Sequence, residues 1–363
     1  RNRRAGQDLS QNIPQMEQKY NNLNDKQQEA VDHGSGPILI AAGAGSGKTK
    51  TLTTRLMKII ERGVNPANII AITFTNKAAN EMKERVRGAG EAFIGTFHSL
   101  GVRILKEESK LLGRNAYFTI YDNDDSLSLI RQILKQLDIS KEAANPVKLQ
   151  GKFSSIKNEL IEPKEYLEPN LIHLFDKYEQ ALQENNAFDF DDLIEKPVKL
   201  FENHPEILAK YQNRFQQVLV DEYQDINTSQ YRLIRLLAEK HQNISVVGDD
   251  AQSIYRFRGS DFRNFLNFEQ DWPNAKIVKL EQNYRSTANI INAASALIKK
   301  NSMQTPKTLW TDNEAGDPIW VVKAYDADEE AQFVAREIKS RIKNQELRVK
   351  SEKNESLIHN SPF

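Results

Sequence analysis

The stretch Ala41-Ala42-Gly43-Ala44-Gly45-Ser46-Gly47-Lys48-Thr49, residues 41–49, is the strongest fold signal in this chain. It follows the apolar run 37–41 and precedes a segment, 52–60, whose apolar residues recur at helical spacing. Strand, glycine loop and helix in this order are typical of a phosphate-binding loop, because glycines let backbone N–H groups converge on phosphate oxygens and the helix N-terminus adds partial positive charge. Lys48 is then expected to reach the β- and γ-phosphates, and Thr49 to place its hydroxyl on Mg²⁺. The usual pattern opens with glycine; Ala42 stands there, and its small side chain still permits the turn.

Composition limits the partners and the setting. The 363 residues, 39% hydrophobic and 28% charged, are enough for two or three domains. Lys and Arg together number 50, as do Asp and Glu, so a nucleic-acid site has to be a local patch. The chain has no Cys, which excludes disulfides and Cys-based zinc sites and favours a reducing, cytoplasmic setting. No run approaches the ~20 apolar residues of a membrane span, and the first residue, Arg1 instead of Met, is consistent with a fragment boundary.

The N-terminal region predicts a disordered lead and one short helix. Residues 1–20 are rich in Gln, Asn and Arg and lack apolar periodicity. In 23–31, Asn24 or Asp25 can cap a helix that carries its apolar residues inward. Gln27 can then offer a donor and an acceptor to the edge of an adenine; the alternative is an ordinary surface residue.

Two further buried strands are predicted at 69–74 and 93–98, with a helix between them. Strands that alternate with helices indicate a parallel sheet, and such sheets bind ligands beyond the carboxyl ends of their strands. The side chains at those ends can stack on bases or hydrogen-bond phosphates, which suits a single nucleic-acid strand: Phe74, Thr75, Asn76, Thr96 and His98. The alternative is that Phe74 and Phe97 belong to the core and the polar residues cap helices.

Residues 121–186 carry helical patterns without a convincing buried strand, broken by Pro146, Pro163 and Pro169. Because the strand pattern resumes afterwards, we interpret this region as a helical insertion into the α/β domain. Three of its lysines either contact phosphate or line a solvated helix face: Lys148, Lys152 and Lys157.

The buried strand 218–220 ends in Asp221-Glu222. Asp221 is expected to hold Mg²⁺ through water, and Glu222 to orient and deprotonate the water that attacks the γ-phosphate. Acidic pairs are common on surfaces. The apolar strand before this pair, and the glycine loop elsewhere in the chain, favour the catalytic interpretation.

Two loops that follow strands complete the motifs. After 244–247, Gln252 is placed to sense the γ-phosphate, and three residues are expected to face nucleic acid: Tyr255, Phe257 and Arg258. The alternative is that one of the two rings packs inward. After 275–280, Tyr284 is expected to stack on adenine and Arg285 to approach the γ-phosphate as an arginine finger.

Together these segments resemble the UvrD/Rep/PcrA group of superfamily 1 DNA helicases, in order and in approximate spacing, across about Leu23 to Lys339. The resemblance is carried by Leu23-Asn24 through Gln27, Ala42 through Thr49, Ile72-Thr73-Phe74-Thr75-Asn76-Lys77-Ala78-Ala79, Thr96-Phe97-His98-Ser99, Asp189-Phe190-Asp191-Asp192-Leu193, Asp221-Glu222-Tyr223-Gln224-Asp225, Gly248-Asp249 with Gln252-Ser253-Ile254-Tyr255, and Gln282-Asn283-Tyr284-Arg285-Ser286-Thr287. Joint agreement of so many segments is highly specific.

The resemblance implies an α/β fold: a RecA-like P-loop NTPase domain with a parallel sheet (21–115 and 188–282), a helical insertion (116–187) and a partial second RecA-like domain (283–345). It implies ATP and Mg²⁺ as cofactors, single-stranded DNA and its junctions with duplex as partners, a location at the nucleoid, and ATP-driven 3′ to 5′ movement. The implied catalytic residues are Lys48, Asp221, Glu222, Gln252 and Arg285, with Thr49 and Asp221 at the metal. The implied ATP-binding residues are Gln27, Gly43, Gly45, Ser46, Gly47, Lys48, Thr49, Lys50, Arg55 and Tyr284.

The chain departs from the family pattern after Thr287, where no distal motif is found. Residues 319–322 are predicted to form a strand, and Ala331, Val334 and Ile338 to share one face of a helix. Residues 346–363 are polar and aperiodic, so we expect an irregular tail and a truncated, frameshifted or deliberately cut copy.

Two functions therefore stay open. The first is a DNA-stimulated ATPase and helicase, because the motifs of the first domain are complete. The second is a module that binds nucleotide and single strand but hydrolyses slowly and does not unwind, because the distal motifs are missing. A third, the motor subunit of a recombination helicase-nuclease, ranks well below, since the sequence has no nuclease-like carboxylate cluster.

Overall fold

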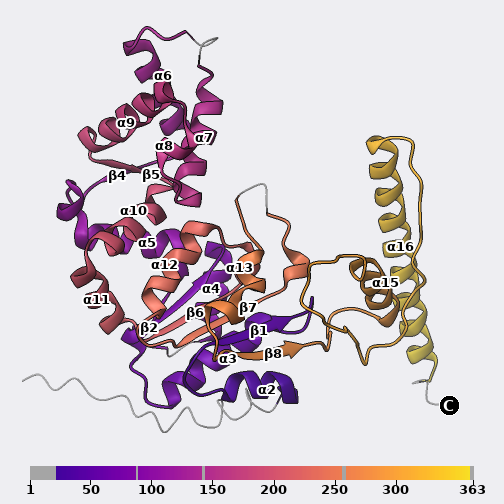
Figure 1. Cartoon of the computed structure of the whole chain (residues 1–363). Coiled ribbons are helices and arrows are strands. Elements are labelled where there is room, and N and C mark those ends of the chain that lie inside the picture. The colour runs from indigo at the N-terminus through magenta and orange to yellow at the C-terminus, as the bar shows by residue number, and fades with distance from the viewer. Residues whose placement is uncertain (1–21, 87–88, 141–143, 256–258, 360–363) are drawn as a thin grey trace, which may run out of the picture. The chain divides into compact units, whose positions relative to one another are not determined.

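The computed structural model describes residues 22–86, 89–140, 144–255 and 259–359 (Figure 1). The expected lead, 1–20, and two predicted DNA-binding residues, Phe257 and Arg258, lie outside this described part. The chain divides into two compact units between Ala315 and Gly316. None of the described helices is both long enough and apolar enough to cross a membrane.

The first unit is built on one parallel sheet of six strands in the order β3-β2-β6-β7-β1-β8. The strands are β1 (Ile38–Ala42), β2 (Ile69–Thr73), β3 (Phe93–Thr96), β6 (Gln217–Val220), β7 (Ile244–Gly248) and β8 (Lys276–Leu280). β1, β2 and β7 are buried along their whole length, as in sheets that helices cover on both faces. The predicted α/β fold with a parallel sheet is confirmed.

Two layers of helices cover the sheet, because successive residues of a strand face opposite sides. Ile38 and Ile40 of β1 pack in the cluster of α2 (Asp25–Asp32), α3 (Lys48–Glu61) and α4 (Asn76–Arg85). Leu39 and Ala41 pack in the opposite cluster. That second layer contains α5 (Phe97–Glu108), α10 (Asp192–Asn203), α11 (Pro205–Arg214), α12 (Thr228–Ala238), α13 (Arg263–Leu266) and α14 (Phe268–Asp271). Short 3₁₀ turns are η2 (Pro66–Asn68), η3 (Ser109–Leu112), η4 (Tyr223–Asp225) and η5 (Asp250–Gln252).

The helical insertion has a hydrophobic core of its own. Its helices, at the top of Figure 1, are α6 (Asn123–Gln136), α7 (Pro146–Glu159), α8 (Pro163–Tyr166) and α9 (Pro169–Glu184). The prolines that break the sequence pattern are the first residues of α7, α8 and α9, where a missing N–H costs no helix hydrogen bond. A pair of short parallel strands, β4 (Thr119–Tyr121) and β5 (Ala187–Asp189), flanks these helices and was not predicted.

The third predicted strand is too long by two residues. β3 ends at Thr96, and Phe97 and His98 already belong to α5. The Thr96 side chain accepts a hydrogen bond from the Ser99 N–H, and the Ser99 hydroxyl accepts one from the Thr96 N–H. This capping box starts the helix and thereby ends the strand.

Two predictions for the C-terminal part are wrong. Residues 319–322 do not form a strand, because no described strand pairs with them and unpaired backbone groups favour solvent; their apolar side chains are exposed. α16 (Ala327–His359) continues through 346–359, where an irregular tail was expected. This stretch contains no Gly or Pro, so nothing ends the helix that starts at Ala327. α15 (Ala288–Ile298) lies before this unit, in the first one.

Candidate nucleotide and nucleic-acid site

The predicted phosphate-binding loop joins β1 to α3 at the carboxyl edge of the sheet. Gly45 and Gly47 have φ angles of +65° and +85°, which glycine adopts without strain. Gly47 is the N-cap of α3 and has no side chain to occupy the first amides of the helix. A Cβ on Gly47 would also come within 2.8 Å of Gln27 Nε2. The loop therefore has the backbone shape and the open helix terminus that bind phosphate.

Two acidic residues after β6 face the first two residues of α3. The Thr49 hydroxyl donates a hydrogen bond to Asp221 Oδ2 at 3.3 Å, and Lys48 Nζ lies 3.2 Å from Glu222 Oε2. They meet because only β7 separates β6 from β1 and all three strands end at the same edge. Burial, and then the adjacent Glu222 carboxylate, raise the pKa of Asp221 to about 6. Hydroxyl and carboxylate oxygens are the donors that Mg²⁺ prefers, so Thr49 and Asp221 fit this ion.

Gln224 joins this acidic pair to the loop after β7. Its Nε2 donates to Glu222 Oε2 at 2.9 Å, and its Oε1 accepts the Asp249 N–H at 3.0 Å. Asp249 Oδ2 in turn accepts a hydrogen bond from Gln252 Nε2 at 2.6 Å. The predicted base and the predicted γ-phosphate sensor are thus linked through two side chains. No role was predicted for Gln224; the signal in the sequence is an amide two residues after Glu222, at the end of a strand.

Gln27, which was predicted to read an adenine, uses its side chain for hydrogen bonds within the protein. Its buried side chain donates from Nε2 to the Ser46 carbonyl at 2.8 Å, and its Oε1 accepts the Asn24 N–H at 3.1 Å. Gln27 therefore stabilises the loop through a hydrogen bond to its backbone. Asn24 Nδ2 donates to the Tyr284 hydroxyl at 2.7 Å, which brings the predicted adenine-stacking ring beside α2. Tyr284 remains half exposed, and Arg285 follows it with an exposed side chain.

Arg55 is not at the nucleotide site. Its buried guanidinium donates to three carbonyls at the end of α2, those of Ala30, His33 and Gly34, and to Ser245 Oγ near the start of β7. Six residues of helix carry Arg55 about 9 Å beyond Thr49, toward the opposite edge of the sheet. The structure contradicts the ATP-binding role predicted for Arg55. The exposed ammonium of Lys50 donates to the Asn22 carbonyl at 2.6 Å.

Two aromatic stacks lie beyond the carboxyl ends of β2 and β3. Phe74 stacks on Tyr255 with ring centroids 5.5 Å apart, and His98 stacks on Phe190 at 4.0 Å. Burial lowers the pKa of His98 to about 4, so the ring is neutral near pH 7. Phe190, to which sequence analysis gave no role, is 49% exposed. Partly exposed rings of this kind are surfaces on which bases stack.

The alternative interpretation holds for three neighbours of these rings. Thr75 caps α4 by accepting the Ala78 N–H, and Thr96 caps α5. Phe97 belongs to the core. Asn76 is exposed in the first turn of α4, beside Phe74.

Lys157 is completely buried, so neither the phosphate contact nor the solvated face considered for it is right. Its ammonium lies 2.7 Å from Glu179 Oε1, 2.6 Å from Asp189 Oδ2 and 2.8 Å from Asp192 Oδ1. These three acids have the spacing of a metal site, but the ammonium already lies among them. Lys148 is exposed on the same helix and Lys152 is partly buried.

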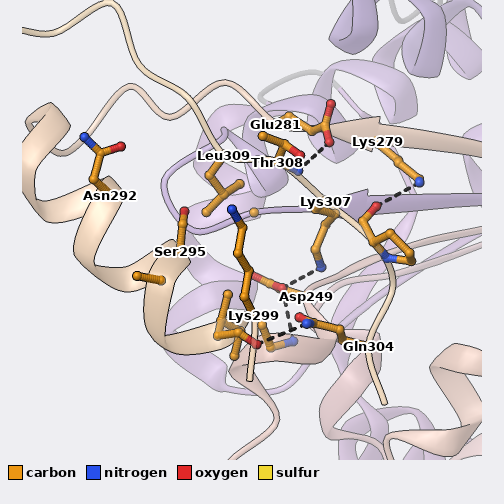
Figure 2. A pocket seen from close by; sticks show the side chains of 15 residues that line it. Asp249, Lys279, Glu281, Asn292, Ser295, Lys299, Gln304, Lys307, Thr308 and Leu309 are labelled. Atoms are coloured by element: carbon orange, nitrogen blue, oxygen red, sulfur yellow. Dashed lines mark hydrogen bonds and ion pairs between the residues drawn. The ribbon is translucent and has the colours of Figure 1, made fainter. Parts of the chain in front are cut away.

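A pocket of about 840 Å³ adjoins the glycine loop (Figure 2). It is lined by Gly43 and Asp249, by α15 and by the segment that follows α15. Lys307 of that segment lies 2.7 Å from Asp249 Oδ1 and also pairs with Asp250. The Leu309 side chain fills the space that a Cβ on Gly43 would need. The chain after α15 therefore packs directly against the loop and the turn after β7.

Comparisons with known proteins agree along most of the chain. Residues 23–273 match the model of the UvrD/REP helicase N-terminal domain, and residues 278–355 match that of the UvrD-like helicase C-terminal domain. The chain is 48% identical over 334 residues to the ATP-dependent DNA helicase PcrA of Bacillus subtilis, covering 88% of this chain and 45% of the relative. It is 46% identical over 342 residues to the ATP-dependent DNA helicase PcrA of Staphylococcus aureus, covering 91% and 47%. The chain thus spans about half the length of the curated relatives it matches.

Proposed function

Because this chain belongs to the UvrD/REP helicase family, we propose that it is the motor core of an ATP-dependent DNA helicase. It binds Mg²⁺ and ATP at the loop 43–49 and single-stranded DNA across the carboxyl edge of the sheet, and moves 3′ to 5′. The observation that carries this function is the contact of Thr49 with Asp221 beside the ion pair of Lys48 with Glu222. A hydroxyl and a cation at the start of α3, facing two carboxylates at the end of β6, are the parts of a phosphoryl-transfer site.

Each of these side chains has a distinct task in the proposed reaction. Lys48 exchanges the Glu222 carboxylate for the β- and γ-phosphates when the triphosphate enters. Glu222, released from Lys48, orients the attacking water and accepts its proton. Thr49 and Asp221 would hold Mg²⁺, which supplies charge neutralisation at the phosphate oxygens. Arg285, exposed beside the loop, approaches the γ-phosphate.

The DNA side of the site is built on the two aromatic stacks. Phe74 with Tyr255, and His98 with Phe190, offer rings on which bases of any sequence can stack, each for about 1–3 kcal/mol. Tyr255 lies three residues after Gln252, so one turn touches both ligands. The links from Glu222 through Gln224 and Asp249 to Gln252 offer a route by which hydrolysis affects the grip on DNA.

A second candidate is favoured by the length of the chain. The 334 aligned residues cover 45% of the Bacillus subtilis relative. A chain that holds the loop and both acids but only part of the second domain can bind nucleotide and single strand while hydrolysing slowly and not unwinding.

Hydrolysis of Mg·ATP, measured with and without oligothymidine, tests these candidates. For the motor core we expect single-stranded DNA to raise the rate. Binding of both ligands with a rate that DNA leaves unchanged favours the second candidate. If the chain binds no Mg·ATP, both candidates are wrong.

A further inference from the structure

Asn283 is a buried amide that connects the glycine loop with the Arg285 segment. It lies between β8 and α15 and is 2% exposed. Its side chain makes three hydrogen bonds, one from Nδ2 and two to Oδ1. None of the roles derived above uses this residue.

The Nδ2 arm of Asn283 holds the loop from the side away from the phosphates. It donates to the Ala44 carbonyl at 2.5 Å, and the next backbone N–H, that of Tyr284, donates to the Gly45 carbonyl at 3.0 Å. In a trans peptide the C=O of one residue and the N–H of the next point in opposite directions. Holding the Ala44 carbonyl therefore sets the direction of the Gly45 N–H, one of the groups expected to face phosphate.

The close approach at this point requires glycine in the loop. A Cβ on Gly45 would lie 2.6 Å from Asn283 Nδ2 and 2.9 Å from the Arg285 Cβ. Gly45 thus allows both the left-handed backbone and the packing of Asn283 against it.

The Oδ1 arm of Asn283 sets the backbone that carries Arg285. It accepts the N–H groups of Arg285 at 2.8 Å and Ser286 at 2.7 Å, which closes a turn around the side chain. This turn fixes the direction in which the Arg285 side chain leaves the backbone.

The backbone of Asn283 is itself anchored. Its N–H donates to the Trp310 carbonyl at 2.8 Å, and the Trp310 N–H donates to the Glu281 carbonyl at 3.1 Å. The amide therefore cannot shift without disturbing the chain on both sides.

We propose that Asn283 is a positioning residue that aligns the glycine loop through Nδ2 and Arg285 through Oδ1. This role rests on the proposed function. The two arms serve different phosphates: the loop contacts groups that ADP and ATP share, whereas Arg285 serves the γ-phosphate, which ADP lacks.

Two substitutions separate the arms. Asn283→Ser is too short to reach Ala44, but its hydroxyl can still accept the N–H groups of the turn. In Asn283→Leu the side chain has a similar size but can neither donate the hydrogen bond to Ala44 nor accept those of the turn. Asn301→Ser, in an exposed turn after α15, is the matched control. The 363-residue chain is titrated by calorimetry with Mg·ADP and with the Mg²⁺ complex of a non-hydrolysable ATP analogue, and thermal unfolding is followed for each variant.

We expect Asn283→Ser to weaken the binding of both nucleotides by the same factor, about five- to tenfold for one lost hydrogen bond. Asn283→Leu weakens Mg·ADP to the same extent and the ATP analogue by a further fivefold or more. Asn301→Ser changes neither affinity. If Asn283→Leu fails to fold, Asn283→Ser still tests the Nδ2 arm. A loss of affinity for the ATP analogue alone, or no loss of affinity, overturns the role of that arm. Equal losses for both nucleotides in Asn283→Leu overturn the role of the Oδ1 arm. If the wild-type chain binds neither nucleotide, the proposed function falls and this role with it.

Discussion

Lys48 and Glu222 lie 3.2 Å apart, and in the proposed function the triphosphate enters between them. Lys48→Ala removes the cation that balances the phosphates, so we expect at least a tenfold loss of affinity for Mg·ATP. Glu222→Gln keeps the shape and can still accept the hydrogen bond from Gln224, but it cannot take a proton. We therefore expect binding within about twofold of wild type and hydrolysis slower by about 10²–10⁴. Calorimetry and steady-state hydrolysis measure the two effects; equal losses of affinity in both variants would contradict the assignment.

His98 makes the stability of the chain depend on pH. Burial lowers its pKa from 6.5 to about 4 in the folded state, so the unfolded state binds the proton more readily between these values. The contribution of His98 to stability is complete above about pH 6.5 and is lost as the pH falls toward 4; at pH 5 the loss is about 2 kcal/mol.

Urea unfolding at pH 7.5 and pH 5 measures this effect. Between pH 7.5 and pH 5, we expect the free energy of unfolding to fall by about 2 kcal/mol less in His98→Gln than in wild type. Other titrating groups, such as Asp221, contribute equally to both chains and cancel in this comparison. His173→Gln, on an exposed position of α9, is the control and should behave as wild type. If the free energy of unfolding changes by the same amount between the two pH values in wild type and in His98→Gln, the buried ring does not titrate in this way.

At the scale of elements, the junction between the helical insertion and the sheet domain depends on buried charge. Lys157 of α7 pairs with Glu179 of α9, Asp189 of β5 and Asp192 of α10. The next residue, Asn158, donates to Asp191 at 2.9 Å and accepts from Asn227, the N-cap of α12, at 2.7 Å. Two adjacent residues of α7 therefore join the insertion to α10 and α12 of the sheet domain.

Removing Lys157 takes away the cation that Glu179, Asp189 and Asp192 share, and leaves Lys196 paired with Glu179 and Asp192. We expect Lys157→Met to lower the free energy of unfolding by about 3–5 kcal/mol. Lys148→Met, on an exposed position of the same helix, should change it by less than about 0.5 kcal/mol. Urea denaturation of both variants is the measurement, and similar midpoints would show that the buried network adds nothing to stability.

Most elements could be predicted because their signals are local. The apolar runs of β1, β2 and β7 and the helical spacing of α3 lie within single stretches of sequence. The failures have physical causes outside those stretches: Thr96 and Ser99 cap a helix inside a predicted strand, and residues 319–322 have no described strand to pair with. Backbone pairing and capping outweighed β-propensity in both places.

At the scale of the whole molecule, motif order predicted which residues meet but not how each is used. A parallel sheet brings the ends of β1 and β6 together, so Thr49 could be expected beside Asp221. The hydrogen bonds of Gln27 and Asn283 to the glycine loop could not be predicted, because they join segments that lie far apart in the chain. Arg55 shows the converse: its spacing in α3 carries it to the wrong edge of the sheet for its predicted role.

We propose that nucleotide and single-stranded DNA bind at one edge of the same sheet and influence each other. Coupled sites are reciprocal: if one ligand changes the affinity for the second, the second changes the affinity for the first by the same factor. The most direct measurement is the dissociation constant of a fluorescent oligothymidine with and without a saturating non-hydrolysable Mg·ATP analogue, together with the reverse titration. We predict a change of about fivefold or more, equal in both directions. If both ligands bind tightly but neither changes the dissociation constant of the other, the two sites are not coupled and the proposal is wrong.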